Sequence, residues 1–370
     1  MNFGFGFDLG SVALLGGSDA LMPSLSNVNS TGGYALNCSG SLLAYAANEI
    51  RYGCLDGRQA ILVEAGATNL MPYSGDFGGF GMSEDSPSRV TITPNYAEAP
   101  DGTMTAALVE ILAQYGAVQL LDIISAAAAS GVTYTGSIWS KWIGGNDNLH
   151  IRGSGLGLVY LTPITVTDEW TRHSGSWTGN GTNGMGLVVQ DRNNSGWGSF
   201  LIWGAQLEEG PLPTSYIPTN GAAASRAADL VTAPLTGDYP NGVRVRGTFR
   251  LDAIAGNFDR LFALDDGTTN NRILFYRHKT AGNFQMSVVA GGASQGVMSY
   301  SGSTLGETLE VDLTITPDAI SGTINGDTVS AALSGAYTAP TIARLGHSLG
   351  GVNIPARLLC SKLLVSEVAA

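Results

Sequence analysis

Apolar and polar residues alternate in many short runs of this chain, and glycine-containing turns separate the runs. Alternation with a period of two predicts β-strands with one buried face. The clearest strands are expected at 132–143, 243–253 and 309–315, which are rich in β-branched or aromatic residues. Further strands are expected at 169–177, 186–190, 273–278, 284–290 and 356–368. Short strands at this spacing predict an all-β protein.

Two segments carry additional signals. In 320–331 the pair Asn325-Gly326 favours a type I′ turn, so this segment is expected to form a hairpin. In 106–129 leucine and isoleucine recur at helical spacing before an alanine run, and propensity alone favours a helix. The surrounding pattern favours strands, and we predict strands there, with a helix as the alternative.

The segment 200–229 begins as a strand and ends in a proline-rich exit, FLIWGAQLEEGPLPTSYIPTNGAAASRAAD. Its first part alternates, with Trp203 on a buried face. Pro211, Pro213 and Pro218 cannot donate to a sheet ladder, so strand pairing is expected to stop there. Such an exit is expected where a β-domain ends and a linker begins.

A length of 370 residues suggests two or three domains. We predict two β-sandwich (jelly-roll) domains in tandem, at 61–232 and 233–370, after a short irregular N-terminal segment at 1–60. Hydrophobic residues make up 44% of the chain and charged residues only 13%, which provides for sizeable cores and argues against disorder.

Acidic residues outnumber basic ones, and the net charge is −12. Residues 1–229 hold 8 Lys or Arg against 19 Asp or Glu, and residues 230–370 hold 10 against 11. Neither part has the basic excess that binding to a phosphate backbone requires, so nucleic acid is not an expected partner. No uninterrupted apolar stretch reaches the ~20 residues of a membrane span, so no membrane insertion is expected.

Three cysteines, Cys38, Cys54 and Cys360, are too few for a disulfide scaffold. No Lys or Arg precedes Arg51, so the basic region of a secretory signal is not evident. We therefore expect a soluble protein made in a reducing cytoplasm. Buried thiols are the expected state of all three cysteines, with a Cys38–Cys54 bridge as the alternative.

Three segments carry a family resemblance: 45–77 (YAANEIRYGCLDGRQAILVEAGATNLMPYSGDF), 99–106 (APDGTMTA) and 200–229. In this order they resemble motifs of bacteriophage virion proteins, the head or tail fibre and spike proteins. There they frame a jelly roll similar to carbohydrate-binding modules. Residues 240–370 resemble a concanavalin A-like (laminin G-like) sandwich, through RLFALDDGTTNNRILFYR, the TINGDTV hairpin and the ARLGHSLGG turn.

The resemblance implies a non-enzymatic structural protein of the virion that binds host surface polysaccharide for adsorption. The N-terminal segment would attach to other virion proteins, and a homotrimer is expected because fibres often occupy symmetric positions. No cofactor is expected. Similarity to sugar-binding jelly rolls implies at most a structural calcium ion, with Asp101 as the candidate ligand and a turn-forming role as the alternative.

All six tryptophans lie between positions 139 and 203. An exposed indole ring can stack on the apolar face of a sugar, while amide and carboxylate side chains bind its hydroxyls. Alternation places Trp139 and Trp203 in the core. The candidate carbohydrate-binding residues are Trp142, Trp177 and Trp197, with Asp191, Asn193 and Asn194 as polar neighbours of Trp197. Core packing is the alternative for each tryptophan.

Two competing functions follow from the same sequence. A decoration or cement protein would pack its sandwiches on other virion subunits, and burial of Trp142, Trp177 and Trp197 would favour it. A polysaccharide-degrading enzyme of the laminarinase-like pattern would need a third carboxylate after Glu310 and Asp312. Thr314 stands at the next position on that face, which argues against the enzyme.

Overall fold

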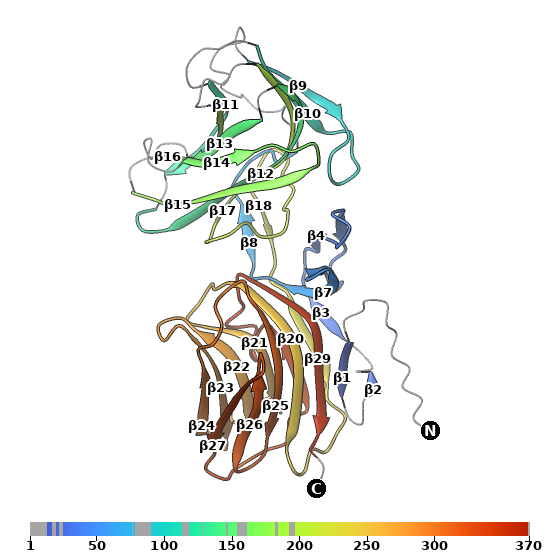
Figure 1. The fold of residues 1–370 in the computed structure, drawn as a ribbon, viewed down its shortest axis with the longest axis vertical. Coiled ribbons are helices and arrows are strands. Elements are labelled where there is room, and N and C mark those ends of the chain that lie inside the picture. Colours follow the sequence, from blue (N-terminus) through green and yellow to red (C-terminus); the bar gives the residue numbers. More distant parts are fainter. Residues whose placement is uncertain are drawn as a thin grey trace. The chain divides into compact units, whose positions relative to one another are not determined.

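A computed structural model describes residues 13–16, 20–21, 25–75, 77, 90–112, 118–127, 129–145, 147–153, 161–181, 184–191 and 197–368. Every regular element among them is a β-strand (Figure 1). The all-β prediction is therefore confirmed, including strands at Ala106–Ile111 and Val118–Ala127, where helical spacing competed. No helix in this part of the chain is suited to cross a membrane.

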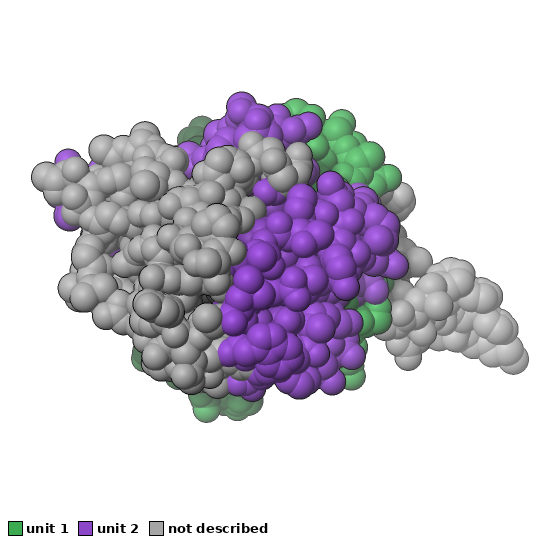
Figure 2. Space-filling model, turned by 90° about the horizontal axis from the view of Figure 1, so that it is seen from above, with its two compact units in different colours: residues 1–40, 45–66, 227–370 green, residues 41–44, 67–226 purple. Residues whose placement is uncertain are grey.

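The chain forms two compact units, which Figure 2 colours separately. Unit 1 contains residues 1–40, 45–66 and 227–370, and unit 2 contains residues 41–44 and 67–226. This division differs from the predicted one at 60/61 and 232/233. The N-terminal segment is part of the same unit as the C-terminal sandwich, because its strands pair with strands from that sandwich.

Unit 1 is a sandwich of two sheets (Figure 1). The first sheet has the order β2 (Ala20–Leu21), β1 (Ala13–Gly16), β29 (Arg357–Glu367), β20 (Val243–Ala253), β25 (Thr308–Ile315), β26 (Ala319–Ile324) and β27 (Asp327–Ala332). The hairpin of β6 (Tyr52–Leu55) and β7 (Arg58–Val63) joins it through β29. The second sheet has the order β24 (Ala293–Tyr300), β23 (Asn283–Ala290), β22 (Arg272–His278), β21 (Phe258–Asp265), β28 (Ile342–Leu345), β19 (Leu230–Pro234) and β3 (Ser26–Val28).

The core of unit 1 follows from the alternation seen in the sequence. Strand β20 alternates between buried and more exposed positions along its whole length, with Phe249 inward and Arg244 outward. Phe249 packs against Phe262 of the opposite sheet, with ring centroids 5.8 Å apart. At the predicted type I′ turn, Asn325 and Gly326 both have positive φ, at 51° and 85°. The hairpin prediction is therefore confirmed.

The described residues of unit 2 form three sheets. The five-stranded sheet has the order β15 (Thr171–Thr178), β12 (Thr133–Gly145), β17 (Gly198–Glu209), β10 (Ala106–Ile111) and β9 (Val90–Ala97). The four-stranded sheet has the order β11 (Val118–Ala127), β16 (Gly184–Asp191), β13 (Asn148–Gly153) and β14 (Leu161–Thr165). A two-stranded sheet pairs β18 (Ala224–Arg226) with β8 (Ala67–Asn69). Two further short strands are β4 (Gly33–Leu36), which belongs to unit 1, and β5 (Leu42–Tyr45), most of which belongs to unit 2.

A buried charge cluster in unit 1 connects Arg51 and Glu64 with Asp229, which lies far along the chain from both. Arg51 is 1% exposed; its Nη1 lies 3.0 Å from Glu64 Oε2, and its Nη2 pairs with Asp229. Asp229 also accepts hydrogen bonds from the Glu64 backbone N–H at 3.0 Å and from Asn29 Nδ2 at 2.9 Å. Burial alone would lower the pKa of the guanidinium, but the attraction of both carboxylates raises the pKa above its usual value.

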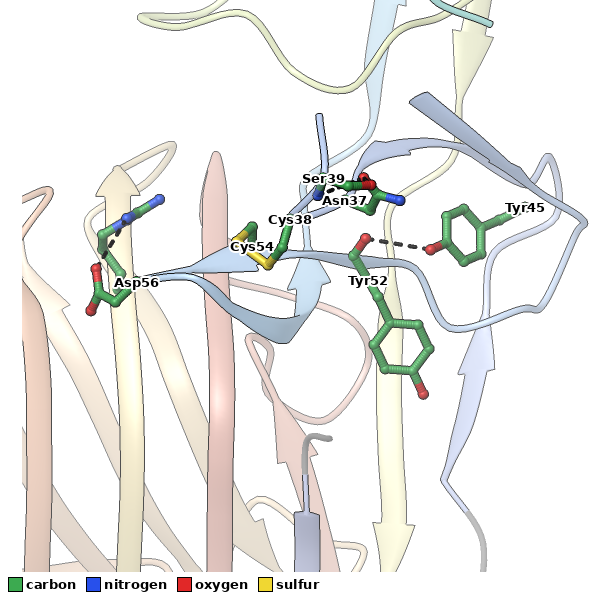
Figure 3. The surroundings of a disulfide bond; sticks show 8 residues. Asn37, Cys38, Ser39, Tyr45, Tyr52, Cys54 and Asp56 are labelled. Atoms are coloured by element: carbon green, nitrogen blue, oxygen red, sulfur yellow. Dashed lines mark hydrogen bonds and ion pairs between the residues drawn. A yellow bond between two sulfur atoms is a disulfide. The ribbon is translucent and has the colours of Figure 1, made fainter. Parts of the chain in front are cut away.

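A disulfide bond joins Cys38 to Cys54, with a Cα–Cα distance of 4.9 Å (Figure 3). The expectation of buried thiols is wrong for this pair, because Cys38 is exposed and Cys54 is half-buried. It holds for Cys360, which is fully buried and whose thiol pKa is raised by that burial. The bridge attaches the loop after β4 to the β6–β7 hairpin.

Replacing Arg51 is expected to destabilise unit 1 strongly. Arg51→Met leaves Glu64 and Asp229 buried without their cation, which should lower the free energy of unfolding by about 3–5 kcal/mol. Arg244→Met is the matched control, since its ion pair with Asp312 is exposed to solvent and its loss should cost less than about 1 kcal/mol. Scanning calorimetry compares the two variants, and equal losses would contradict a special role for the buried cluster.

Reduction of the disulfide is expected to lower the thermal stability of the protein. The bridge closes a loop with a sequence separation of 16, for which the chain-entropy estimate is about 3 kcal/mol. Dithiothreitol should therefore lower the melting temperature of the wild type and leave that of a Cys38→Ser/Cys54→Ser variant unchanged. An equal response of both proteins would show that the reductant acts elsewhere.

Candidate functional site

One corner of unit 2 brings two of the candidate tryptophans together. Strands β12 and β17 pair antiparallel, with Trp142 opposite Phe200 and Gly145 opposite Gly198. Trp197 directly precedes β17, so it lies where β12 ends. The register shifts between Trp142 and Gly144, which marks a β-bulge next to both indoles. Bulges bend the strand and change where neighbouring side chains point.

Gly144 and Gly145, at the end of β12, leave space for the Trp197 side chain. A Cβ atom at Gly145 would lie 2.4 Å from Trp197 Cε3, and one at Gly144 would lie 3.5 Å from Cη2. The φ angle of Gly145 is 76°, a backbone conformation that favours glycine. The absence of a side chain therefore lets the indole lie against the backbone.

The two indoles of this corner differ in exposure. Trp197 is 59% exposed, whereas the other tryptophans with described side chains are buried or half-buried. Trp142 is half-buried against the core of unit 2, and its Nε1 donates to the Gly145 carbonyl at 3.3 Å. Both therefore contact Gly145, and more than half of the Trp197 side chain remains open to solvent. Ile143, which follows Trp142 in sequence, is 51% exposed.

The prediction that Trp177 contacts ligand is wrong. Its side chain is 3% exposed and belongs to the hydrophobic core of unit 2. Strand β15 alternates at this point, with Gly175 and Trp177 buried and Ser176 and Thr178 exposed. The predicted core positions of Trp139 and Trp203 are confirmed, since they are 3% and 1% exposed.

The predicted polar neighbours of Trp197 are only partly placed. Asp191 ends strand β16, and its side chain lies outside the described residues. Asn193 and Asn194 also lie outside them. The site as described therefore consists of Trp197, Trp142 and the two glycines.

Asp101 forms a turn. Its Oδ1 accepts hydrogen bonds from the Thr103 backbone N–H at 3.0 Å and from the Thr103 hydroxyl at 2.6 Å. This is the side-chain-to-backbone pattern of an Asx turn. Across the described part of the chain, no three His, Cys, Asp or Glu side chains gather as metal ligands. The geometry around Asp101 thus fits the turn-forming alternative.

Several buried residues of the three motif segments support the scaffold of unit 2. Asn69 donates to the Ala205 and Ile217 carbonyls at 3.2 and 2.9 Å, and its Oδ1 accepts from the Leu207 N–H at 3.1 Å. Trp203 donates to the Thr105 hydroxyl at 2.9 Å. These bonds connect all three motif segments, which explains why the segments occur together.

A second part of this network holds the proline-rich exit. Glu208 is fully buried and accepts hydrogen bonds from Gln206 and from the Thr214 N–H and hydroxyl. The Tyr216 hydroxyl lies 2.8 Å from the Ser74 hydroxyl. Gln206 and Glu208 are polar, yet both are buried and form hydrogen bonds with the proline-rich exit.

Sequence reasoning missed the role of Gly144 and Gly145. A Gly-Gly pair usually indicates only a turn, and nothing in the local pattern shows that a ring from 52 residues further along covers it. The pairing of β12 with β17 could have indicated this contact, because it brings the end of β12 next to the start of β17, where Trp197 lies.

No family model matches the chain, and no curated protein matches it. Two of the solved structures that match are domains LG4-5 of the mouse laminin alpha1 chain and the CBM22-1-CBM22-2 tandem domain of Xyn10C from Paenibacillus barcinonensis. The laminin structure has 10% identity and a TM-score of 0.28, covering 64% of this chain and 86% of the other. The Xyn10C structure has 11% identity and a TM-score of 0.27, covering 82% and 99%.

At TM-scores this low, neither structure supplies a function for this chain. The β-sandwich architecture rests on the strand order and on the hydrophobic core between the sheets of unit 1.

Tryptophan fluorescence should report the difference in exposure. Trp197→Phe is expected to remove much of the emission that acrylamide quenches, because its indole is open to solvent. Trp177→Phe is the matched control and should leave the quenchable fraction nearly unchanged. A larger loss in the Trp177 variant would contradict the placement of both rings.

Proposed function

We propose that the protein is a non-enzymatic structural protein of a bacteriophage particle, a head or tail fibre or spike, that binds glycans on the host surface. The virion part of this proposal rests on the three motif segments, which resemble those of phage fibre and spike proteins. The glycan part rests on one observation, the solvent-exposed Trp197 ring seated on Gly144 and Gly145 beside Trp142.

The geometry of this corner suits a sugar. A flat indole face offers an apolar surface to the C–H groups of a pyranose ring. Part of the Trp197 ring already lies against Gly144 and Gly145, and the exposed remainder is accessible to a ligand. In sites of this kind a few polar groups orient the sugar through its hydroxyls, and Asp191, Asn193 and Asn194 stay the candidates for that role.

Weak binding at one ring becomes useful when many copies act together. Linked sites convert later binding events into intramolecular ones, which raises avidity by orders of magnitude. A homotrimer displayed repeatedly on a particle would provide this multiplicity. In this proposal the N-terminal segment contacts other virion proteins.

Asp312 gives a physical reason to favour a binding protein over a hydrolase. Arg244 holds the Asp312 carboxylate through two hydrogen bonds of 2.7 Å, and these lower the pKa of Asp312. A glycosidase acid needs a raised pKa so that it is protonated when it acts. The next side chain on the same face is that of Thr314, so the third carboxylate of the laminarinase-like pattern is missing.

The second candidate function is a decoration protein that packs on other virion subunits. The burial of Trp177 favours it, because that ring was one of three whose exposure would have supported glycan binding. Trp197 distinguishes the two proposals, since a packing surface and a sugar site respond differently to its replacement.

Trp197→Ala is expected to weaken binding to host glycans. Wild type and variant are displayed on multivalent beads and tested on a glycan array and in host-cell adsorption. Loss of a central aromatic contact commonly costs more than 1 kcal/mol, so binding per site should fall at least about fivefold. Tyr96→Ala is the matched control, because Tyr96 is a similarly exposed aromatic residue of unit 2, at 55%.

Two results would overturn the glycan proposal. Wild-type protein that binds no host glycan at multivalent display would favour the decoration protein. Equal losses for the Trp197 and Tyr96 variants would show that the corner of β12 and β17 is not the site.

A further inference from the structure

The Cys38–Cys54 bond of unit 1 is accessible from the surface (Figure 3). Cys38 is exposed and Cys54 is half-buried. The bond joins residues 37–40, which we call the Cys38 loop, to strand β6. Reduction requires a thiolate to reach one of the two sulfur atoms, so an accessible bond can react while the rest of the unit stays folded.

The residues before the Cys38 loop are held in place by contacts that do not involve sulfur. Ala35, in β4, is 2% exposed and packs in a small hydrophobic cluster that includes Leu55 of β6. The Arg51 guanidinium, part of the buried charge cluster, donates from Nη1 to the Tyr34 carbonyl oxygen at 3.0 Å. None of these contacts depends on the disulfide, so they can position the chain up to three residues before Cys38.

The position of Cys54 is set by strand pairing. Cys54 lies opposite Gln59 in the β6–β7 hairpin, and β7 pairs with β29 where Ile61 lies opposite Cys360. Leu55, the residue after Cys54, is 1% exposed. The folded chain can therefore bring the two sulfur atoms of the bridge together before they are bonded, so oxidation can follow folding.

The Cys38 loop also has a local structure. The Oδ1 of Asn37 accepts hydrogen bonds from the Ser39 backbone N–H at 3.0 Å and from the Ser39 hydroxyl at 2.8 Å. The Gly40 N–H donates to the Asn37 carbonyl at 3.1 Å. Ser41, the next residue, belongs to unit 2. The disulfide thus adds a covalent link to β6 directly before the chain first enters unit 2.

Cys360 has the opposite environment. It is fully buried in the core of unit 1, and this burial raises the pKa of its thiol. The thiolate is the reactive form of cysteine, so Cys360 should resist thiol reagents while unit 1 is folded. Its reactivity therefore reports on unfolding of unit 1 separately from the state of the disulfide.

We propose that the Cys38–Cys54 bond is a redox-responsive crosslink that closes on the already folded unit 1 and opens without unfolding it. The thiolate of a small dithiol attacks Cys38 Sγ, the sulfur of the more exposed cysteine, and the S–S bond breaks with Cys54 leaving as a thiolate. The second thiolate of the reductant then attacks the mixed disulfide and releases Cys38.

The exchange is balanced. The two protons of the dithiol pass to the two cysteine thiols, and the reductant leaves as a disulfide after giving up two electrons. Closure is the reverse exchange with a small disulfide such as oxidised glutathione, which is reduced to two thiols. This inference goes beyond the proposed function and does not depend on it, because it concerns only when the Cys38 loop is tied to β6.

The first test labels thiols in the full-length protein under native conditions. The protein is treated with dithiothreitol and then with iodoacetamide, and mass spectrometry measures the labelling of each cysteine. Cys38 and Cys54 should be labelled while Cys360 stays unlabelled. Labelling of all three would show that reduction unfolds unit 1. An unlabelled Cys38 in the absence of denaturant would show that the bond opens only on unfolding. Either result would overturn the inference.

Two single variants test which sulfur is attacked. Cys54→Ser leaves Cys38 as a free thiol, and Cys38→Ser leaves Cys54. With oxidised glutathione, the Cys54→Ser variant should form its mixed disulfide several-fold faster, because Cys38 is exposed and Cys54 is half-buried. Equal rates would contradict attack at Cys38.

Hydrogen exchange tests whether the opening is local. Reduction should speed amide exchange several-fold in residues 37–40 and leave β20 and β25 protected over the same interval, and oxidised glutathione should restore slow exchange. The Cys38→Ser/Cys54→Ser variant is the matched control, and its exchange should not respond to the reductant. Loss of protection in β20 and β25, an unchanged Cys38 loop, or failure of the oxidant to restore it would each overturn the inference.

Discussion

The ion cluster of Arg51, Glu64 and Asp229 is the constraint on which unit 1 depends. Its members come from the N-terminal segment, from the end of β7 and from the residue before β19, and all three are buried. Arg357 adds a second cation, 3.1 Å from Glu64. A buried charge is tolerated only when it is paired and hydrogen-bonded, so none of these segments can leave the cluster without a large cost. The cluster thereby fixes where unit 1 gives way to unit 2 in the sequence.

The functional candidates lie away from such networks. The buried side chains of the motif segments, including Asn69, Glu208 and Asp229, serve the scaffold. Trp197 lies next to a strand end. A rigid interior with variable chemistry at its margins is the usual arrangement of a binding protein. It also means that a motif can identify the scaffold without identifying the ligand.

The sequence predicted the strands well because period-two alternation is a local signal, as β20 and β25 show. It predicted the burial of Trp139 and Trp203 for the same reason. It failed for Trp177, whose polar neighbours suggested exposure although the strand face decides the matter. The Cys38–Cys54 bond and the Gly145 seat depend on contacts between separate segments, which local patterns do not contain.

Strand β29 has a consequence for how the protein is made. It lies between β20 and β1 in the first sheet of unit 1 and also pairs with β7. Val63 and Arg357, which bound these pairing strands, are 294 positions apart. At about 5–20 residues per second, the ribosome needs roughly 15–60 s to synthesise that interval. Residues 67–226 of unit 2 are encoded within it and can therefore fold first. During that time β6 and β7 lack their partner strand, and Cys54 remains accessible to oxidants or to a chaperone.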